Sequence, residues 1–256
     1  MTQFRPSRFE ILPMVIKNLL IINVLVFLAQ KTVGKEGGAF DMESMFALHT
    51  WQSPLFKPWQ FITHMFMHGD IGHIFSNMFA LWMFGSVLEN VWGPKRFITF
   101  YIVCGLGAAL CHMLVLHFET QTMINKFRNL PNDLMAVRSF IEDYADNVRG
   151  PIPISLESAQ AVMNANINTG TLGASGAVFG CLAAFGYLFP NTTIFIGFLF
   201  PIKAKWFVIL YAGFELFAGI QNSAGDNVAH FAHLGGALAG IILVYFWNRN
   251  NRKKFY

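Results

Sequence analysis

Long apolar runs alternate with short polar connections along most of this chain. A helix needs about 20 apolar residues to cross the hydrocarbon core of a bilayer, and several of these runs approach or exceed that length. We expect six spans, at residues 11–33, 59–91, 97–118, 171–189, 206–220 and 228–247. The pattern therefore predicts an all-α membrane protein, a bundle of six transmembrane helices with a long extracytoplasmic loop between the third and the fourth.

The polar segments define the rest of the organisation. Residues 1–10 form a short N-terminal segment, residues 11–247 the membrane domain, and residues 248–256 a basic tail. The longest hydrophilic stretch is the insert at 119–170, which carries charges of both signs. Within it, residues 133–148 have apolar positions at helical spacing, which predicts an amphipathic helix. We expect no separate domain there.

Composition excludes several classes of protein. The chain is 54% hydrophobic and only 12% charged, far from the average of soluble domains. Its net charge of +4 comes from short basic clusters between apolar runs, so nucleic acid is not an expected partner. The three cysteines lie inside apolar runs and do not indicate a disulfide framework. No cleavable signal peptide is evident.

The distribution of Lys and Arg predicts the topology. Basic residues gather at both ends of the chain and in the short 2–3 and 4–5 connections, which a six-span arrangement places on one side. By the positive-inside rule that side is cytoplasmic. The fourth and sixth runs then both begin at the outer surface. From the short tails and the absence of a transit peptide we expect the cell membrane of a bacterium.

A serine and a histidine stand out at the start of these two runs. Ser175 lies among small residues, an arrangement typical either of close helix packing or of an accessible nucleophile. His233 shares a helix face with Gly236 and Gly240, where a neighbouring helix can approach closely. The small residues around Ser175 offer the matching face, so we expect these two faces to be in contact. A serine beside a neutral imidazole is an activated nucleophile, because histidine can take the hydroxyl proton. No Asp or Glu accompanies the pair at helical spacing, so a Ser-His dyad is the expectation.

The second run supplies hydrogen-bond donors. His73 and Asn77 lie four residues apart on one helix face, and His68 lies about one turn before them. Polar groups inside a membrane span are costly and are usually functional. An imidazole and an amide suit an oxyanion, with the backbone N–H of Ser175 as a further donor. For Glu89, at the other end of this run, we expect a bond to a helix end or to a nearby base rather than a role in chemistry.

Together these motifs resemble the rhomboid family of intramembrane serine proteases. The resemblance rests on three motifs in order, on the second, fourth and sixth runs, and covers about residues 55–245. They are His68, His73 and Asn77, then Gly173-Ala174-Ser175-Gly176, then Ala232-His233 with Gly236 and Gly240.

The resemblance implies roles for these residues. Ser175 would be the nucleophile and His233 the general base and acid. Asn77 and His73, with the backbone at Ser175 and Gly173, would line the oxyanion site. The resemblance also implies a six-helix bundle, no cofactor and no metal, and substrates that are transmembrane proteins held in the lipid bilayer.

Some positions differ from the family or leave a choice open. Rhomboids often have Trp-Arg ahead of the second span, and here it reads Trp59-Gln60. An aromatic residue often packs on the catalytic imidazole, and Phe179 occupies that place where many bacterial members have tyrosine. His230, one turn before His233, is the alternative base. His68 and Phe179 are expected to support the site, whereas a structural role is favoured for His64.

Other functions compete with proteolysis. A non-catalytic rhomboid-like protein that binds membrane helices is the main alternative. A metal or haem protein would use the histidines of the second run, but no HExxH motif is present. A transporter is disfavoured because no inverted repeat is visible. The outer connection at 221–227 and the top of the fifth run are our candidates for the element that gates substrate entry. The sequence indicates neither the substrate nor the oligomeric state.

Overall fold

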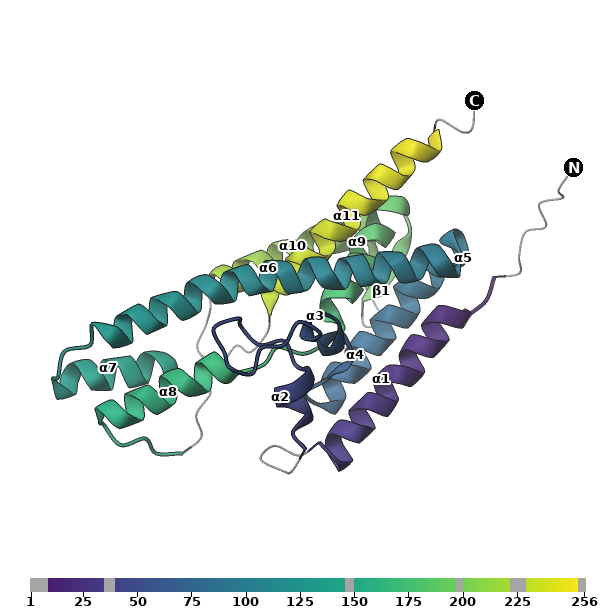
Figure 1. Cartoon of the computed structure of the whole chain (residues 1–256). Coiled ribbons are helices and arrows are strands. Elements are labelled where there is room, and N and C mark those ends of the chain that lie inside the picture. Colours follow the sequence, from purple (N-terminus) through teal and green to yellow (C-terminus); the bar gives the residue numbers. More distant parts are fainter. Residues whose placement is uncertain (1–8, 35–39, 146–149, 197–199, 222–228, 253–256) are drawn as a thin grey trace, which may run out of the picture.

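The computed structural model describes residues 9–34, 40–145, 150–196, 200–221 and 229–252. These residues form helices and one β-hairpin (Figure 1). The elements are α1 (Met14–Thr32), α2 (Met42–Phe46), α3 (Gln60–Thr63), η1 (His64–Phe66), α4 (Ile71–Ala80), η2 (Leu81–Gly85), α5 (Ser86–Trp92), α6 (Pro94–Arg128), α7 (Leu134–Tyr144), α8 (Leu156–Asn168), α9 (Ser175–Leu188), β1 (Thr193–Ile196), β2 (Phe200–Lys203), α10 (Ala204–Gln221) and α11 (His230–Arg252).

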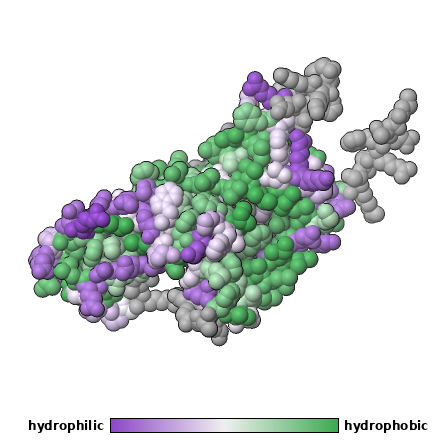
Figure 2. Space-filling view, in the orientation of Figure 1, coloured by the Kyte–Doolittle hydropathy of each residue, from purple (hydrophilic) through white to green (hydrophobic). Residues whose placement is uncertain are grey.

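The protein is a helical, multi-pass membrane protein. Four of its described helices are long and apolar enough to cross a bilayer: Met14–Thr32, Ile71–Trp92, Pro94–Arg128 and His230–Arg249. The second of these is the continuous run of α4, η2 and α5. Helix α9 is apolar but shorter, and α10 has 18 residues. Hydrophobic residues cover the bundle, and hydrophilic ones gather near the α7–α8 end (Figure 2). A count of six spans remains a prediction.

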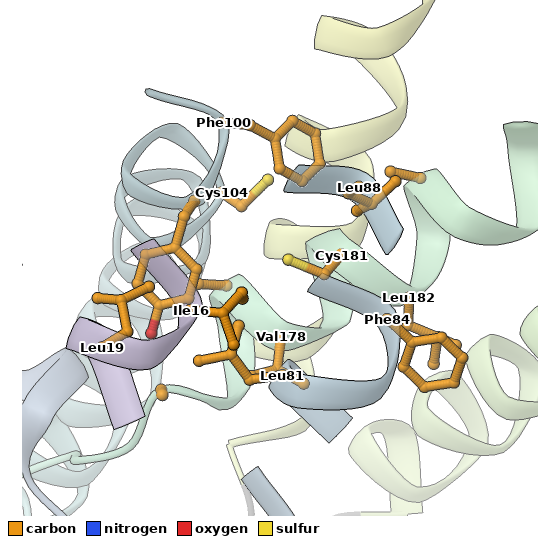
Figure 3. Packing of buried hydrophobic residues seen from close by; sticks show 14 of the residues in the cluster. Ile16, Leu19, Leu81, Phe84, Leu88, Phe100, Cys104, Val178, Cys181 and Leu182 are labelled. Carbon is orange, nitrogen blue, oxygen red and sulfur yellow. The ribbon is translucent and has the colours of Figure 1, made fainter. Parts of the chain in front are cut away.

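Helix α9 is the centre of the bundle. It packs against α6, α11 and η2, and ten of its fourteen residues are buried. A helix that is apolar on every side is typical of such a position. Side chains of α1, η2, α5, α6 and α9 meet in one core (Figure 3). This core places the first residue of α9, Ser175, between the surrounding helices.

Small residues let α9 and α11 approach closely. A Cβ atom added at Gly236 would lie 1.9 Å from the carbonyl oxygen of Gly176, and one added at Gly240 would lie 3.0 Å from that of Gly180. Without side chains at these positions the two backbones come into contact, as in small-residue helix pairs of membranes. The predicted contact between these two small faces is confirmed.

The helix that carries His73 begins later than the sequence pattern indicated. The predicted second span started at residue 59, but the membrane-crossing helix starts at Ile71. Asp70 ends the preceding loop and caps α4 by accepting a hydrogen bond from the backbone N–H of His73 at 2.9 Å. Between residues 59 and 70 the chain forms only the short helices α3 and η1. The apolar run is therefore divided by a local capping interaction, which hydropathy alone does not reveal.

The third helix continues past its predicted end. We expected residues 97–118, whereas α6 runs from Pro94 to Arg128. Its distal part joins α7 and α8 in a second hydrophobic core, made of Met123, Val137, Phe140, Ile141, Ala159 and Val162. Burial of these residues stabilises the extension outside the main bundle. The insert is thus a small helical unit mounted on α6 (Figure 1).

Two further segments can be compared with the expectations. The amphipathic helix expected at 133–148 is present as α7, capped by Asp133, and residues 146–149 lie outside the described part of the chain. In the connection between α9 and α10, β1 and β2 pair antiparallel, with Ile194 opposite Ile202. The gate candidate at 221–227 lies outside the described residues except for Gln221.

Glu89 stabilises the start of α1. Its two carboxylate oxygens accept hydrogen bonds from the backbone N–H groups of Val15 and Ile16, each at 2.9 Å. The residue before this helix, Pro13, provides no side-chain cap. Glu89 therefore satisfies amides that a helix N-terminus leaves unpaired, and the prediction that it bonds a helix end is confirmed.

Candidate functional site

Ser175 is positioned by a tight loop that ends at the first turn of α9. Gly173 has a φ of +132°, a conformation that L side chains rarely adopt, and its N–H donates to the carbonyl of His64 at 2.9 Å. A Cβ atom at Gly173 would lie 2.8 Å from Nε2 of His73 and 3.5 Å from Oγ of Ser175. The glycine therefore allows the loop, the serine and His73 to share one small space.

Two donors on α4 face this region. The N–H of Gly69 lies 3.5 Å from Nδ1 of His73, which favours the tautomer with a proton on Nε2. Nε2 is the atom directed toward Gly173. One turn further along α4, Asn77 is buried, and its Nδ2 has no hydrogen-bond partner among the described residues. Both groups are thus able to donate to a ligand at this place.

His68 lies behind His73. Its side chain is fully buried, its ring sits edge-on to that of His73 with centroids 5.1 Å apart, and neither ring nitrogen has a partner among the described residues. Burial, and then the neighbouring His73, lower the pKa of His68 to about 4, so the ring is neutral. His64 is also buried, with Nδ1 2.8 Å from the carbonyl oxygen of Gln60. Both histidines are buried inside the protein.

His233 is held on the face of α9 that begins with Ser175. The rings of Phe179 and His233 stack, with centroids 4.2 Å apart and planes 4° apart. Phe179 lies one helical turn after Ser175, so the two side chains project from the same face of α9. The packing of an aromatic residue on this imidazole was expected from the sequence and is confirmed.

The site contains a carboxylate that the sequence reasoning missed. Oε2 of Glu215, on α10, lies 2.7 Å from Nδ1 of His230 and 2.8 Å from Nδ1 of His233. All three side chains are buried. Helical spacing along α9 or α11 does not point to Glu215, because this residue lies on the neighbouring helix α10. The available signal was a carboxylate inside the apolar run 206–220.

The same three groups have the chemistry of a metal site. Their ligand atoms all lie within 4.8 Å of one another, and two histidines with one carboxylate form a set that zinc accepts. In the structure the contacts of Glu215 with both imidazoles have the geometry of hydrogen bonds. Those bonds account for the cluster without an ion.

Gln60 occupies the position where the sequence departs from the family pattern. Its side chain is fully buried and anchors the loop that precedes it. Oε1 accepts from the N–H groups of His49 and Lys57, and Nε2 donates to the carbonyl of Leu55 at 2.9 Å. An uncharged amide thus stabilises the loop at this position.

Comparison with known proteins identifies the family. The rhomboid domain matches residues 55–124 and 154–250, and the unmatched stretch falls in the insert that carries α7. The matched residues include both ends of the site, from His64 on η1 to His233 on α11.

Individual relatives come from several kinds of organism. RHOMBOID-like protein 12, mitochondrial, of Arabidopsis thaliana is 25% identical over 94% of this chain and 60% of its own length. Rhomboid protease GluP of Bacillus subtilis is 23% identical over 80% of this chain and 29% of its own length. Rhomboid protease GlpG of Haemophilus influenzae is 21% identical over 88% and 85%. The chain thus spans less than two thirds of the first two relatives. It belongs to the rhomboid family.

Proposed function

We propose that this protein is an intramembrane serine endopeptidase that cleaves peptide bonds in or near the transmembrane helices of other membrane proteins. The observation that carries the proposal is the stacking of His233 on Phe179, one turn after Ser175. This contact sets an imidazole against the face of α9 from which the serine projects. Two relatives of this chain are named rhomboid proteases, which supports the same activity.

In the proposed reaction Ser175 is the nucleophile and His233 the general base and acid. Oγ of Ser175 bonds to the carbonyl carbon of the substrate as its proton passes to Nε2 of His233. That proton then moves to the amine nitrogen as the C–N bond breaks, leaving an ester on Ser175. A water molecule repeats the sequence, giving its proton to Nε2, and the ester bond breaks as Oγ regains a proton.

Donors around the serine would stabilise the tetrahedral oxyanion. Asn77 offers an Nδ2 group with no partner among the described residues, and His73 offers an Nε2–H directed toward Gly173. The backbone N–H of Ser175 is the further proposed donor, and the backbone at Gly173 lines the site while its own N–H donates to the carbonyl of His64. Such preorganised donors are worth several kcal/mol where water is scarce, about 2.7–4 for one donor.

The membrane determines which substrates are accessible. A spanning helix satisfies its carbonyls internally, so a substrate has to unwind near the surface before it can be cut. Segments with glycine and other weak helix formers unwind most easily.

We place both termini in the cytoplasm and the start of α9 near the outer side, from the distribution of Lys and Arg. The relatives include mitochondrial proteins, so they do not decide the membrane in which this protein resides. A bacterial cell membrane remains our prediction.

The proposal is tested by mutating the nucleophile and the base in the purified protein. Ser175→Ala and His233→Ala should abolish cleavage of a membrane-spanning reporter and labelling by a fluorophosphonate, while the thermal midpoint stays near that of the wild type. Ser139→Ala, at an exposed position on α7, is the matched control and should retain full activity. Labelling tests the nucleophile independently of the choice of reporter.

Comparison of the two neighbouring histidines identifies the base. His230→Ala should retain measurable cleavage, because Phe179 stacks on the ring of His233 and so sets that imidazole against the face of α9 that carries Ser175. Activity that survives Ser175→Ala would overturn the proposed nucleophile. A wild-type protein that is neither labelled nor able to cut would instead favour the alternative, a non-catalytic protein that binds membrane helices.

A further inference from the structure

One carboxylate is shared by two buried histidines beside the proposed site. We propose that Glu215 is a positioning residue for His233, so that the base for Ser175 is a His-Glu pair rather than a histidine alone. The inference rests on the proposed function, because it assigns a role in that reaction. Its geometric basis is the 2.8 Å contact between Oε2 of Glu215 and Nδ1 of His233.

The burial of Glu215 requires an explanation. It is the one acidic residue of α10, and the side chain of Glu215 is only 3% exposed. Its neighbours Phe214 and Leu216 are instead exposed on the bundle surface, at 59% and 47%. Helix α10 therefore turns a carboxylate inward and apolar side chains outward. An ionisable group at such depth is costly, and it is usually retained for function and paired with a partner.

The contact determines which nitrogen of His233 can act as a base. An ionised carboxylate only accepts hydrogen bonds, so Nδ1 of His233 carries the proton in the neutral ring. Nε2 then keeps its lone pair for the proton of Ser175. Phe179 stacks flat against the ring and limits its tilt, while Glu215 fixes its rotation about the side-chain bonds. The two contacts together define one orientation.

The carboxylate also acts during the reaction. When His233 takes the serine proton it becomes an imidazolium, and the adjacent negative charge of Glu215 stabilises that cation more than the neutral ring. Glu215 remains ionised throughout, and no proton passes to it. All proton transfers stay between Ser175, His233 and the leaving amine or water, so the steps remain balanced.

His230 holds the other side of the same carboxylate. Its Nδ1 lies 2.7 Å from the same Oε2 atom that His233 contacts. Two donors from consecutive turns of α11 thus restrict Glu215 to one position. We expect His230 to act through Glu215, with a smaller effect on catalysis than Glu215 itself.

The experiment compares Glu215→Ala and Glu215→Gln with the wild type and with Glu142→Gln. Glu142 is exposed on α7, where it pairs with Arg138, and serves as the matched control. For each protein kcat and KM are measured separately on the reporter, together with the labelling rate of Ser175 and the thermal midpoint. Histidines labelled with ¹⁵N report the tautomer of His233.

We expect kcat to fall by about 10²-fold or more in Glu215→Ala, within the range that general base catalysis supplies. KM should change by less than about twofold, since the residue touches no substrate in this scheme. The ¹⁵N spectrum should show Nδ1 of His233 protonated in the wild type and a mixture of tautomers in Glu215→Ala. Glu142→Gln should match the wild type in every measurement.

Several results would overturn the inference. They are an unchanged kcat in Glu215→Ala, a rise in KM alone, or a His233 tautomer that does not depend on Glu215. If Glu215→Ala fails to fold, the nearly isosteric Glu215→Gln carries the test. The tautomer measurement needs no activity, so it still decides whether Glu215 orients His233 if the chain proves unable to cut. Loss of the proposed function and loss of this inference are therefore distinguishable.

Discussion

The contact between α9 and α11 is the feature on which the proposed site most directly depends. Gly236→Ala adds a single methyl group at the closest point of this contact. That Cβ atom would lie 1.9 Å from the carbonyl oxygen of Gly176, whereas ordinary contact begins near 3.4 Å. The two helices would have to separate by the difference, about 1.5 Å, or tilt to the same effect. Backbone atoms on both sides leave no flexible side chain to yield.

The expected cost follows from that separation. Overpacking of a well-packed core costs about 1–3 kcal/mol, and the better helix propensity of alanine returns about 0.5–1 kcal/mol. A net loss of up to about 2.5 kcal/mol should lower the thermal midpoint by a few degrees. The effect on chemistry should be larger. A displacement of about 1 Å between reacting groups can reduce a rate about 10²-fold, and Ser175 and His233 lie on the two helices that are forced apart.

A graded series of glycines provides the assay. At Gly240 the added Cβ would lie 3.0 Å from the carbonyl oxygen of Gly180, so Gly240→Ala should be intermediate. Gly213 on α10 has no atom within 4 Å of such a Cβ, so Gly213→Ala is the matched control and should be as stable as the wild type or slightly more so. Thermal midpoints and fluorophosphonate labelling rates of Ser175 are measured for all three variants.

The order of the three variants is the decisive result. We expect Gly236→Ala to be the least stable and least reactive, then Gly240→Ala, then Gly213→Ala. If Gly236→Ala were as stable and as reactive as Gly213→Ala, close backbone contact between α9 and α11 would not be what holds the site together.

Two further predictions concern helix ends. Glu89→Ala should destabilise the protein by about 1–3 kcal/mol for the buried amide of Ile16, which is left unpaired, and by less for the half-buried amide of Val15. Glu89→Gln keeps one acceptor oxygen and should cost less, so equal thermal midpoints of the two variants would contradict this. The hydrogen bond from the His73 amide holds the pKa of the Asp70 carboxyl below its usual range. The stability that ionised Asp70 contributes is therefore present near neutral pH, and it is lost as the pH falls through that lowered pKa. On acidification the thermal midpoint of the wild type should therefore fall more steeply than that of Asp70→Asn, and parallel curves would refute the linkage.

The linear pattern of the chain was sufficient for the class of protein and for the separate motifs. Apolar runs indicate membrane helices because the bilayer imposes a length and excludes polar side chains. The glycines of α11 indicated a close helix contact, because positions without a side chain let a neighbouring helix approach, whichever helix that is. The bonding of Glu89 was also expected from its place at the end of a run, whereas the packing of Phe179 on His233 was implied by the family resemblance.

Only the tertiary structure decided which groups meet. Glu215 lies 15 residues before His230 and on another helix, so no spacing rule connects it with either histidine. The late start of α4 depends on a cap at Asp70, and the length of α6 depends on a second core formed with the insert. In each case the deciding energy comes from a contact between segments distant in sequence or from a local cap that competes with hydropathy. Hydrophobic periodicity reports how each segment partitions into the membrane, whereas these contacts depend on how the segments are packed against one another.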